Sequence, residues 1–399
     1  MGKIELKAFL ADPAASTPSA KIVRVLSEKG ALSGARIAGI TGLAKSTVSI
    51  TLAELRKSGI IVEGLAPSDR IASVGRPSTT MMLNPRAGTC VGVLIGMQHI
   101  QVIIADVSHA ILADKRVYLD PDFSPERAAE IANELISNSC DELGISEDTI
   151  LGVGVALAAP INPLDGKVLR AGGIPTWTGV DIKAAFEPVL QHPVFADNES
   201  NCSAIAEMMW GAAVGHEDFV LFTIDVGVGG AIVNRGHVIT GIAGAAGEFG
   251  HMSINPEGAL CRCGNRGCLE LYASFREPLL LAAKRFGRPM TSRDVVALAL
   301  EGDVGCQRLI TDSAEAAGRG LGIVGSVLNP GLVVVGGGLI RAGEMFLEPL
   351  EASYNKHTLV KRSDVAANAR TRFVPSKFTE NDACMGAVGL VLRHHGRRA

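Results

Sequence analysis

The hydrophobic positions of the chain follow two patterns, and the change comes near Asn84-Pro85. Before that point the spacing is helical. Val48, Leu52 and Leu55 recur at i, i+4 and i+7, which buries one stripe of a helix and exposes the opposite face. We expect helices over residues 21–30, 34–40 and 45–55, followed by strands that begin within 59–63. This order of elements predicts a winged helix-turn-helix domain over residues 1–80.

The exposed face of the third expected helix carries short hydrogen-bond donors and a cation near its N-terminal end. Such groups contact phosphates and base edges when a recognition helix enters the major groove of DNA. Arg76 stands before Pro77, which favours extended backbone and suits an arginine for a narrow minor groove. A three-helix bundle with a plain polar face is the alternative. The predicted DNA-binding residues are Lys45, Ser46, Thr47, Ser49, Thr51 and Arg76.

Beyond Asn84-Pro85, short apolar runs alternate with helical patterns, which is typical of an α/β protein. A helix is expected over 125–140, with Ser124 as its N-cap and Pro125 in its first position. Two halves each begin with a strand pair and a glycine turn. This repetition resembles the two-lobed, ribonuclease H-like architecture of actin-like proteins and sugar kinases. The expected strands are 90–95, 101–106, 151–156, 220–225, 231–233 and 332–335.

These patterns divide the chain into an N-terminal domain, a linker and two lobes. The N-terminal domain covers residues 1–80 and the linker covers 81–88. The first lobe covers 89–196 and is completed by a C-terminal helix over 382–399. The second lobe covers 197–381.

Length and composition agree with several domains. A chain of 399 residues, 47% of them hydrophobic and 20% charged, is typical of a globular protein with two or three domains. The first 80 residues carry a net charge of +5 and the rest −8, which favours a nucleic-acid-binding head on an acidic body. The sequence has no apolar run of the ~18 residues that span a bilayer. Its eight cysteines suit a reducing compartment better than a disulfide framework, so we expect a cytoplasmic protein.

One histidine and three cysteines lie within a short segment of the second lobe: His251, Cys261, Cys263 and Cys268. They are the ligand set of a closed tetrahedral zinc site, which leaves no coordination position for water and therefore shapes a loop. Two carboxylates, Glu248 and Glu270, flank them. Three buried free cysteines beside an unrelated histidine are the alternative. The prediction is one structural zinc ion per chain.

Four stretches of the body carry a family resemblance: 224–233, 241–251, 261–270 and 328–338. With the glycine loop, Gly-Glu-x-Gly-His and the cysteine cluster in this order, the chain resembles the ROK (repressor, open reading frame, kinase) family over essentially its whole length. The expected head places it in the repressor branch, because the kinase members lack that head. The resemblance implies a sugar pocket on a zinc-held loop, with hydroxyl groups bound by Asn198, Glu199, Glu248, His251 and Glu270.

Two departures from the family pattern concern the kinase reaction. Active members begin the body with Asp-x-Gly-Gly-Thr, which manages ATP phosphates and magnesium, whereas this chain has Leu94-Ile95-Gly96-Met97-Gln98. The Glu-Asn-Asp motif that carries the catalytic base reads Asp197-Asn198-Glu199. Phosphoryl transfer depends on positioning and charge neutralisation, and a displacement near 1 Å can cost ~100-fold in rate. We expect no catalytic residue, with Glu199 as a degenerate base, and no enzyme activity.

The sequence therefore predicts a sugar-responsive transcriptional regulator of carbohydrate uptake or catabolism genes, and repression is the usual behaviour of the family. The expected partners are double-stranded operator DNA, a sugar or sugar-phosphate effector, and further copies of the chain in a homodimer or homotetramer, with no membrane. Two alternatives stay open. One is a sugar kinase with an appended DNA-binding head, and the other is a DNA-binding protein whose body only forms dimers.

Overall fold

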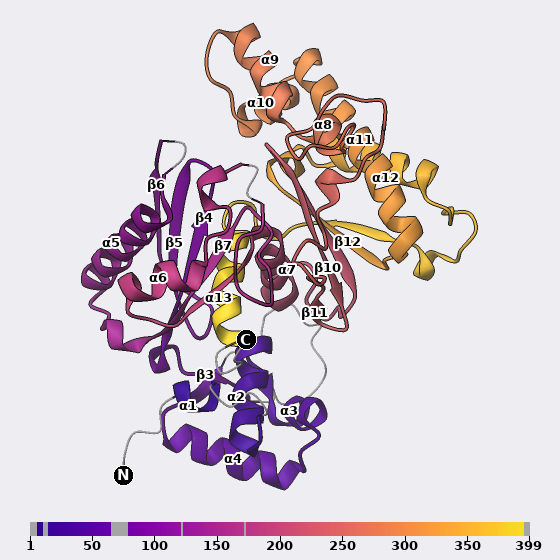
Figure 1. The fold of residues 1–399 in the computed structure, drawn as a ribbon. Coiled ribbons are helices and arrows are strands. Elements are labelled where there is room, and N and C mark those ends of the chain that lie inside the picture. Colours follow the sequence, from indigo (N-terminus) through magenta and orange to yellow (C-terminus); the bar gives the residue numbers. More distant parts are fainter. Residues whose placement is uncertain (1–5, 11–14, 65–78, 121–122, 171–172, 395–399) are drawn as a thin grey trace. The chain divides into compact units, whose positions relative to one another are not determined.

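The computed structural model describes residues 6–10, 15–64, 79–120, 123–170 and 173–394. Figure 1 shows their helices and strands. Contacts divide the chain into two compact units, residues 1–209 with 383–399 and residues 210–382. The sequence assigned residues 197–209 to the second lobe, whereas contacts group them with the first unit. Apart from that difference, the predicted boundaries of the two lobes stay a prediction.

Helices and a small sheet form a winged helix-turn-helix head at the start of the first unit. Thr17 caps the second helix by accepting a hydrogen bond from the backbone of Ala20, and Gly30, with a φ of 70°, ends it. The three helices expected from the sequence are present, and a short helix precedes them. The elements are α1 (Leu6–Leu10), α2 (Pro18–Lys29), α3 (Gly34–Thr41), α4 (Lys45–Lys57) and the antiparallel strands β1 (Leu32–Ser33), β2 (Ile61–Gly64) and β3 (Thr80–Leu83), in the order β1-β3-β2.

Strand β3 corrects the prediction of a linker over residues 81–88. Its residues pair with β2 in antiparallel register, and Leu83 is buried. Only its two ends, Thr80 and Leu83, are fully buried, so the strand lacks the alternation of apolar and polar residues by which a sequence pattern is recognised. The expected wing residue Arg76 lies outside the described residues.

A five-stranded mixed sheet is the centre of the first lobe, in the order β6-β5-β4-β7-β8. Strand β4 pairs antiparallel with β5 and parallel with β7. Ser124 caps α5 as expected, accepting from the backbone of Arg127, and the helix continues past the predicted end. The elements are β4 (Thr89–Ile95), β5 (His99–Asp106), β6 (Ile111–Tyr118), α5 (Pro125–Leu143), β7 (Ile150–Leu157), α6 (Ile182–Leu190), β8 (Val194–Asn198), α7 (Glu199–Trp210) and α13 (Asp382–His394).

The C-terminal helix α13 packs directly on the central strands of the first lobe. A side chain at Gly92 on β4 would clash with the carbonyl oxygen of Cys384, and one at Gly154 on β7 would clash with that of Ala387. Glycine at both positions therefore lets the helix backbone approach the sheet closely. The sequence suggested this return of the chain, because a helix was expected at the C-terminus to complete the first lobe.

The second unit repeats the topology of the first sheet in the order β11-β10-β9-β12-β13, with antiparallel pairs up to β9 and parallel pairs beyond it. This repetition confirms the duplicated α/β body. Its core includes the fully buried rings of Phe222, Phe275 and Phe346. The elements are β9 (Phe219–Ile224), β10 (Val228–Asn234), β11 (His237–Val238), α8 (Glu270–Ala273), α9 (Arg276–Phe286), α10 (Ser292–Leu300), α11 (Val304–Leu328), β12 (Leu332–Gly336), α12 (Glu344–His357) and β13 (Arg372–Pro375).

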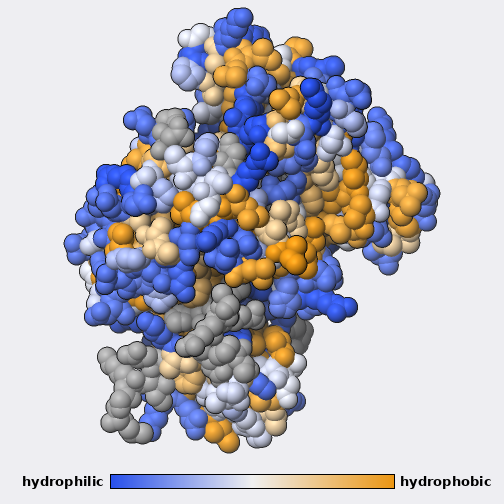
Figure 2. All heavy atoms as spheres, viewed as in Figure 1, coloured by the Kyte–Doolittle hydropathy of each residue, from blue (hydrophilic) through white to orange (hydrophobic). Residues whose placement is uncertain are grey.

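The surface of the second unit carries exposed hydrophobic side chains around α9 and α10 (Figure 2). Leu280, Leu281 and Leu300 are each more than 60% exposed. Exposed apolar groups that lie together favour an interaction with another surface. Among the described helices, none combines the length and hydrophobicity that crossing a bilayer requires.

Candidate functional site

The Gly-Glu-x-Gly-His stretch, residues 247–251, packs closely against strand β10. The close approach is possible because glycines stand at the contact points in both segments. A Cβ at Gly230 would clash with the ring of Phe249, and one at Gly250 would clash with the carbonyl oxygen of Val228. Gly247 has a φ of 88°, a left-handed conformation that favours glycine. The backbone therefore fixes the residues between these glycines on the sheet, among them Glu248.

Four predicted metal ligands come together beside this stretch. The ligand atoms of His251, Cys261, Cys263 and Cys268 all lie within 4.8 Å of one another. Nδ1 of His251 is 3.7 Å from Sγ of Cys261, and Sγ of Cys263 is 3.6 Å from Sγ of Cys268. The turn that brings the cysteines together is closed by a hydrogen bond of 2.7 Å from the backbone of Cys261 to the carbonyl of Asn265.

These separations fit a tetrahedral ion. Metal–sulfur distances near 2.3 Å and metal–nitrogen distances near 2.0 Å give ligand–ligand edges of roughly 3.5–3.8 Å. Cys261 and Cys268 are buried and the other two ligands are half-buried, so the donors face a protected position. All eight cysteines are free thiols, and none is held in a disulfide. The cluster can therefore hold a metal ion, as the sequence predicted.

Arg262, between two of the cysteine ligands, makes a bidentate ion pair that the sequence prediction missed. Its Nε and Nη2 both donate to Glu270, at 2.9 Å each. The Glu270 side chain is only 6% exposed, whereas that of Arg262 is 32% exposed. The paired geometry orients the buried carboxylate. This pairing has no local signal in the sequence, because Arg262 stands in a spacer position of the cysteine motif.

Glu248 and Glu270 form a second polar group next to the metal ligands. Burial and the negative charge of Glu270 raise the pKa of Glu248, and Arg262 opposes this shift. A Cβ at Gly227 in the β9–β10 turn would lie 3.4 Å from Oε2 of Glu270, so this turn also borders the carboxylate. Carboxylates held by a fixed loop are suited to accept hydrogen bonds from hydroxyl groups of a ligand.

The Asp197-Asn198-Glu199 segment lies where β8 passes into α7. Oδ1 of Asn198 accepts from the backbone of Ser200 at 2.8 Å, which leaves the amide nitrogen as the donor toward a ligand. Asp197 accepts from Asn201 at 2.8 Å, and burial raises the pKa of Asp197. The two predicted sugar contacts of this segment, Asn198 and Glu199, belong to the first unit, whereas the other three belong to the second. That all five share one pocket stays a prediction.

The β4–β5 turn contains Gly96, Met97 and Gln98, part of the run that departs from the expected Asp-x-Gly-Gly-Thr pattern. The turn is closed by a hydrogen bond of 2.9 Å from the backbone of Gly96 to the carbonyl of His99. A Cβ at Gly96 would clash with the His99 ring. Leu94 and Met97 are partly buried, and Gln98 is exposed. The described turn therefore offers no carboxylate for magnesium.

In the second unit, the side chain of Asp225 occupies the corresponding β9–β10 turn. Its carboxylate accepts hydrogen bonds from the Ser292 side chain and from the backbone N–H groups of Gly338 and Val226. Burial raises the pKa of Asp225, and these hydrogen bonds oppose that shift. The carboxylate thus joins the β9–β10 turn to the second glycine turn, 336–338, through the backbone N–H of Gly338.

Helix α4 presents most of its predicted DNA contacts to solvent. Lys45, Ser46 and Ser49 are exposed, and Thr47 is partly exposed. Thr51 is 5% exposed, so the prediction that it lies on the exposed face of the helix is wrong. At 3.6 residues per turn, Thr51 falls on the same stripe as Val48, Leu52 and Leu55, the buried residues of this helix.

The described features define a class of protein: a two-lobed α/β body with a repeated sheet and a metal-ligand loop, joined to an N-terminal winged helix-turn-helix. The ROK family model matches residues 90–394 of the chain. The chain belongs to the ROK family.

Relatives of both kinds, repressors and kinases, resemble the chain. The xylose repressor of Bacillus subtilis (strain 168) is 28% identical over 374 residues, which cover 94% of each chain. The glucokinase of Halalkalibacterium halodurans is 31% identical over 237 residues, 55% of this chain and 71% of its own. A ROK family transcriptional regulator, a homolog of the E. coli MLC protein, has a TM-score of 0.74 at 21% identity and covers 98% of this chain and 97% of its own. At 21% identity, this similarity shows a shared fold and no more.

Proposed function

We propose that the protein is a sugar-responsive transcriptional repressor of carbohydrate uptake or catabolism genes. The observation that carries this proposal is the match to the xylose repressor over 94% of both chains, which includes the head as well as the body. The polar, exposed N-terminal part of α4 supports DNA binding. The carboxylates of Glu248 and Glu270 support recognition of hydroxyl groups.

The metal of the proposed repressor is one structural zinc ion per chain. His251, Cys261, Cys263 and Cys268 would hold it, and the donor set and separations suit zinc. With four protein ligands the ion has no open position, so it supplies cross-linking of the loop and no chemistry on a substrate. The protein residues then do the binding: the loop keeps Glu248 in place, and Arg262 keeps Glu270 in place.

DNA binding is proposed to use two or more copies of the head. Lys45 and Ser46 at the start of α4 would contact phosphates, and Ser49 would contact base edges. A homodimer or homotetramer presents such helices in pairs, which matches a palindromic operator. The exposed leucines around α9 and α10 support assembly of this kind.

A sugar kinase with an added head is the second candidate, favoured by the glucokinase relative. Three observations weaken it. The β4–β5 turn carries Leu94 and Gln98 in place of carboxylate and hydroxyl, Glu199 stands at the position of the base, and Asp225 places a partly buried carboxylate at the second glycine turn. Like charges repel, so this last site disfavours a nucleotide phosphate. We therefore propose that the body binds sugar and does not phosphorylate it.

The test of DNA binding uses the full-length protein and an operator fragment selected from random DNA. Lys45→Ala should weaken binding to all sequences, because it removes a phosphate contact, and Ser49→Ala should change base preference. Lys183→Ala removes an exposed lysine from α6 and serves as the control. Specific binding that persists undiminished after deletion of residues 1–80 would show that the head is not the DNA-binding part.

The test of the kinase candidate is ATP consumption with a panel of sugars. The proposed repressor gives no turnover above background. Phosphorylation of any sugar at an ordinary enzymatic rate, on the order of 1 per second or more, would support the kinase and contradict the proposal.

A further inference from the structure

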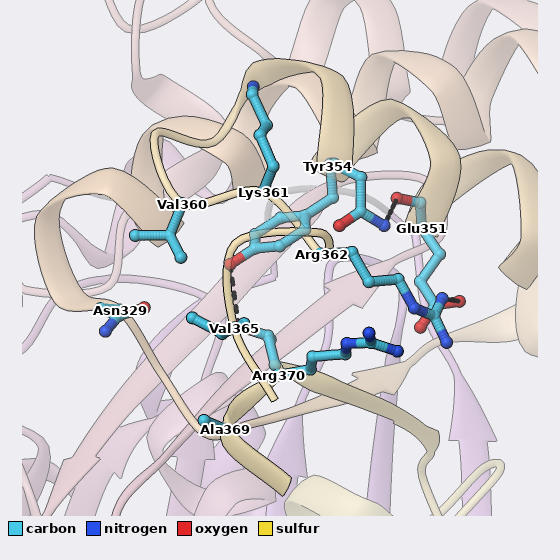
Figure 3. Close-up of a pocket in the computed structure, with 11 residues that line it drawn as sticks. Asn329, Glu351, Tyr354, Val360, Lys361, Arg362, Val365, Ala369 and Arg370 are labelled. Atoms are coloured by element: carbon cyan, nitrogen blue, oxygen red, sulfur yellow. Dashed lines mark hydrogen bonds and ion pairs between the residues drawn. The ribbon is translucent and has the colours of Figure 1, made fainter. Parts of the chain in front are cut away.

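A small pocket lies in the second unit at the start of strands β12 and β13, beside the C-terminal end of α12 (Figure 3). It is open to solvent. The residues that line it include Asn329, Tyr354, Lys361, Arg362, Arg370 and Thr371. It is therefore built from the C-terminal end of α11, helix α12 and the segment that leads into β13.

The pocket does not belong to the proposed sugar site or to the glycine turns. The glycine turn of residues 336–338 follows the C-terminal end of β12, whereas the pocket lies before its N-terminal end. A strand rises ~3.3 Å per residue, so the five residues of β12 separate the two places by roughly 15 Å. A ligand of this pocket would bind to a second, separate place on the body.

Positive charge dominates the pocket lining. It contains Lys361, Arg362 and Arg370 but a single carboxylate, that of Glu351. Nη1 of Arg362 lies 3.5 Å from Oε2 of Glu351, so that carboxylate is shared with one arginine. Figure 3 shows the side chains of Arg362, Arg370 and Glu351 extending toward the same side of the pocket. A net charge of about +2 is left for a ligand to neutralise.

The guanidinium of Arg370 lacks an acceptor at one of its donors. Its Nε is buried and has no hydrogen-bond partner among the described residues. A buried charged donor without an acceptor is unfavourable, and an oxyanion removes that deficit. Lys361 differs, because its Nζ already donates to the backbone carbonyls of Lys356 and Thr358. The arginines are therefore the groups that would hold the ligand, and Lys361 adds charge.

Fixed polar groups form the wall near β13. Oη of Tyr354 is 3.0 Å from Oγ1 of Thr371, and Thr371 donates to the carbonyl of Pro330 at 2.8 Å. The Tyr354 ring packs edge-on against Phe373, with 5.0 Å between the ring centres. These contacts hold the wall in place before any ligand enters, which favours binding of a small rigid group.

We propose that this pocket binds a phosphate group, either free phosphate or the phosphate of a small phosphate monoester. A phosphate dianion neutralises the net charge of the lining, whereas a single carboxylate neutralises half of it. The planar guanidinium also matches the geometry of phosphate oxygens.

The test uses full-length protein and inorganic phosphate, with chloride at equal ionic strength as the reference. Calorimetry should detect phosphate binding to the wild-type protein, and phosphate should raise its unfolding temperature. Arg370→Gln should weaken phosphate binding at least tenfold. Glu351→Gln should strengthen it, because it frees Arg362 from its ion pair. Arg308→Gln, which removes an exposed arginine of α11, is the control and should leave phosphate binding unchanged.

The opposite signs of the Arg370 and Glu351 substitutions separate a binding effect from a folding effect. Glycerol 2-phosphate, measured in parallel, distinguishes the two forms of the ligand: tighter binding than inorganic phosphate indicates a monoester, and weaker binding indicates free phosphate. Absence of phosphate binding beyond the chloride reference overturns the proposal. So does equal binding by the wild type and Arg370→Gln, or weaker binding by Glu351→Gln.

Discussion

The first strand of each lobe ends in a turn, and the two turns have different chemistry although the sheets around them share one topology. The β4–β5 turn has no carboxylate and closes on itself through Gly96 and His99. The β9–β10 turn contains the partly buried carboxylate of Asp225 and borders Glu270, next to the metal-ligand loop. One sheet topology thus carries a turn without a carboxylate in the first lobe, and in the second lobe a turn with a carboxylate beside the metal-ligand loop.

The first lobe instead contacts the head. Nε2 of His109, in the β5–β6 turn, lies 3.0 Å from the carbonyl oxygen of Ser27 in α2. His109 has a φ of 78°, unusual for a residue with a side chain, so the turn is held in this conformation by its surroundings. The second lobe therefore carries the metal-ligand cluster and the carboxylates, and the first lobe contacts the winged helix-turn-helix head.

The largest expected effect comes from the metal-ligand loop. Cys263→Ser should release the zinc that the wild type holds, about one ion per chain, and should abolish sugar binding because the loop that carries Glu248 loses its cross-link. Metal analysis and calorimetry with a sugar panel measure the two losses together. Cys140→Ser, a buried cysteine of α5 outside the cluster, is the matched control. Freshly purified wild type without zinc, never exposed to chelator, would contradict the assignment.

The carboxylates should affect the response to sugar and leave DNA binding intact. We expect Glu248→Gln and Glu270→Gln to bind operator with wild-type affinity but to show no change on addition of sugar, because the head is untouched. Operator titrations with and without the sugar panel measure this. Glu257→Gln alters an exposed glutamate of the same loop and should keep the response. If both carboxylate variants respond like the wild type, the sugar lies elsewhere.

The β9–β10 turn should contribute to stability. Asp225→Ala leaves the Gly338 N–H and the Ser292 hydroxyl without their acceptor, and unsatisfied buried donors cost about 1–3 kcal/mol. Denaturant unfolding measures the loss. Asp312→Ala, at an exposed ion pair of α11, should change stability far less. Equal stability of the two variants would mean that the Asp225 carboxylate does not hold the two glycine turns together.

The contact of His109 with Ser27 in the head should make the free energy of unfolding depend on pH. Burial lowers the pKa of His109 from 6.5 to about 4, opposed by the Ser27 carbonyl and Asp106. Because the folded pKa lies below the unfolded one, the contribution is fully present above pH 6.5 and is lost as pH falls toward 4. Between pH 6.5 and 5 the loss is up to about 2 kcal/mol. Thermal unfolding should show a smaller loss for His109→Gln and an unchanged loss for the exposed control His237→Gln.

Much of the fold could be predicted because its signals are local. Apolar runs bounded by glycine identified the central strands, Ser124-Pro125 identified the start of α5, and the spacing of His251 and the cysteines identified a cluster that could hold a metal ion. Each of these signals depends on residues a few positions apart.

The features that were missed depend on the surroundings of a residue. Thr51 is polar in sequence but lies on the buried stripe of α4, and β3 pairs with strands far from it in the chain. Arg262 looks like a spacer, and only the folded loop brings it to Glu270. Asp225 ends an apolar strand, and its role appears only when Gly338, more than a hundred residues later, donates to it.

The central claim is tested most directly by the operator affinity of the full-length wild type. Fluorescence anisotropy measures this affinity with and without each sugar of a panel that includes xylose and glucose. A ligand shifts an equilibrium only by its different affinities for two states, and coupling of ~1–3 kcal/mol corresponds to a change of about 5–150-fold. We predict a change of this size with at least one sugar. An operator affinity that stays the same at saturating concentrations of every sugar would contradict a sugar-responsive repressor.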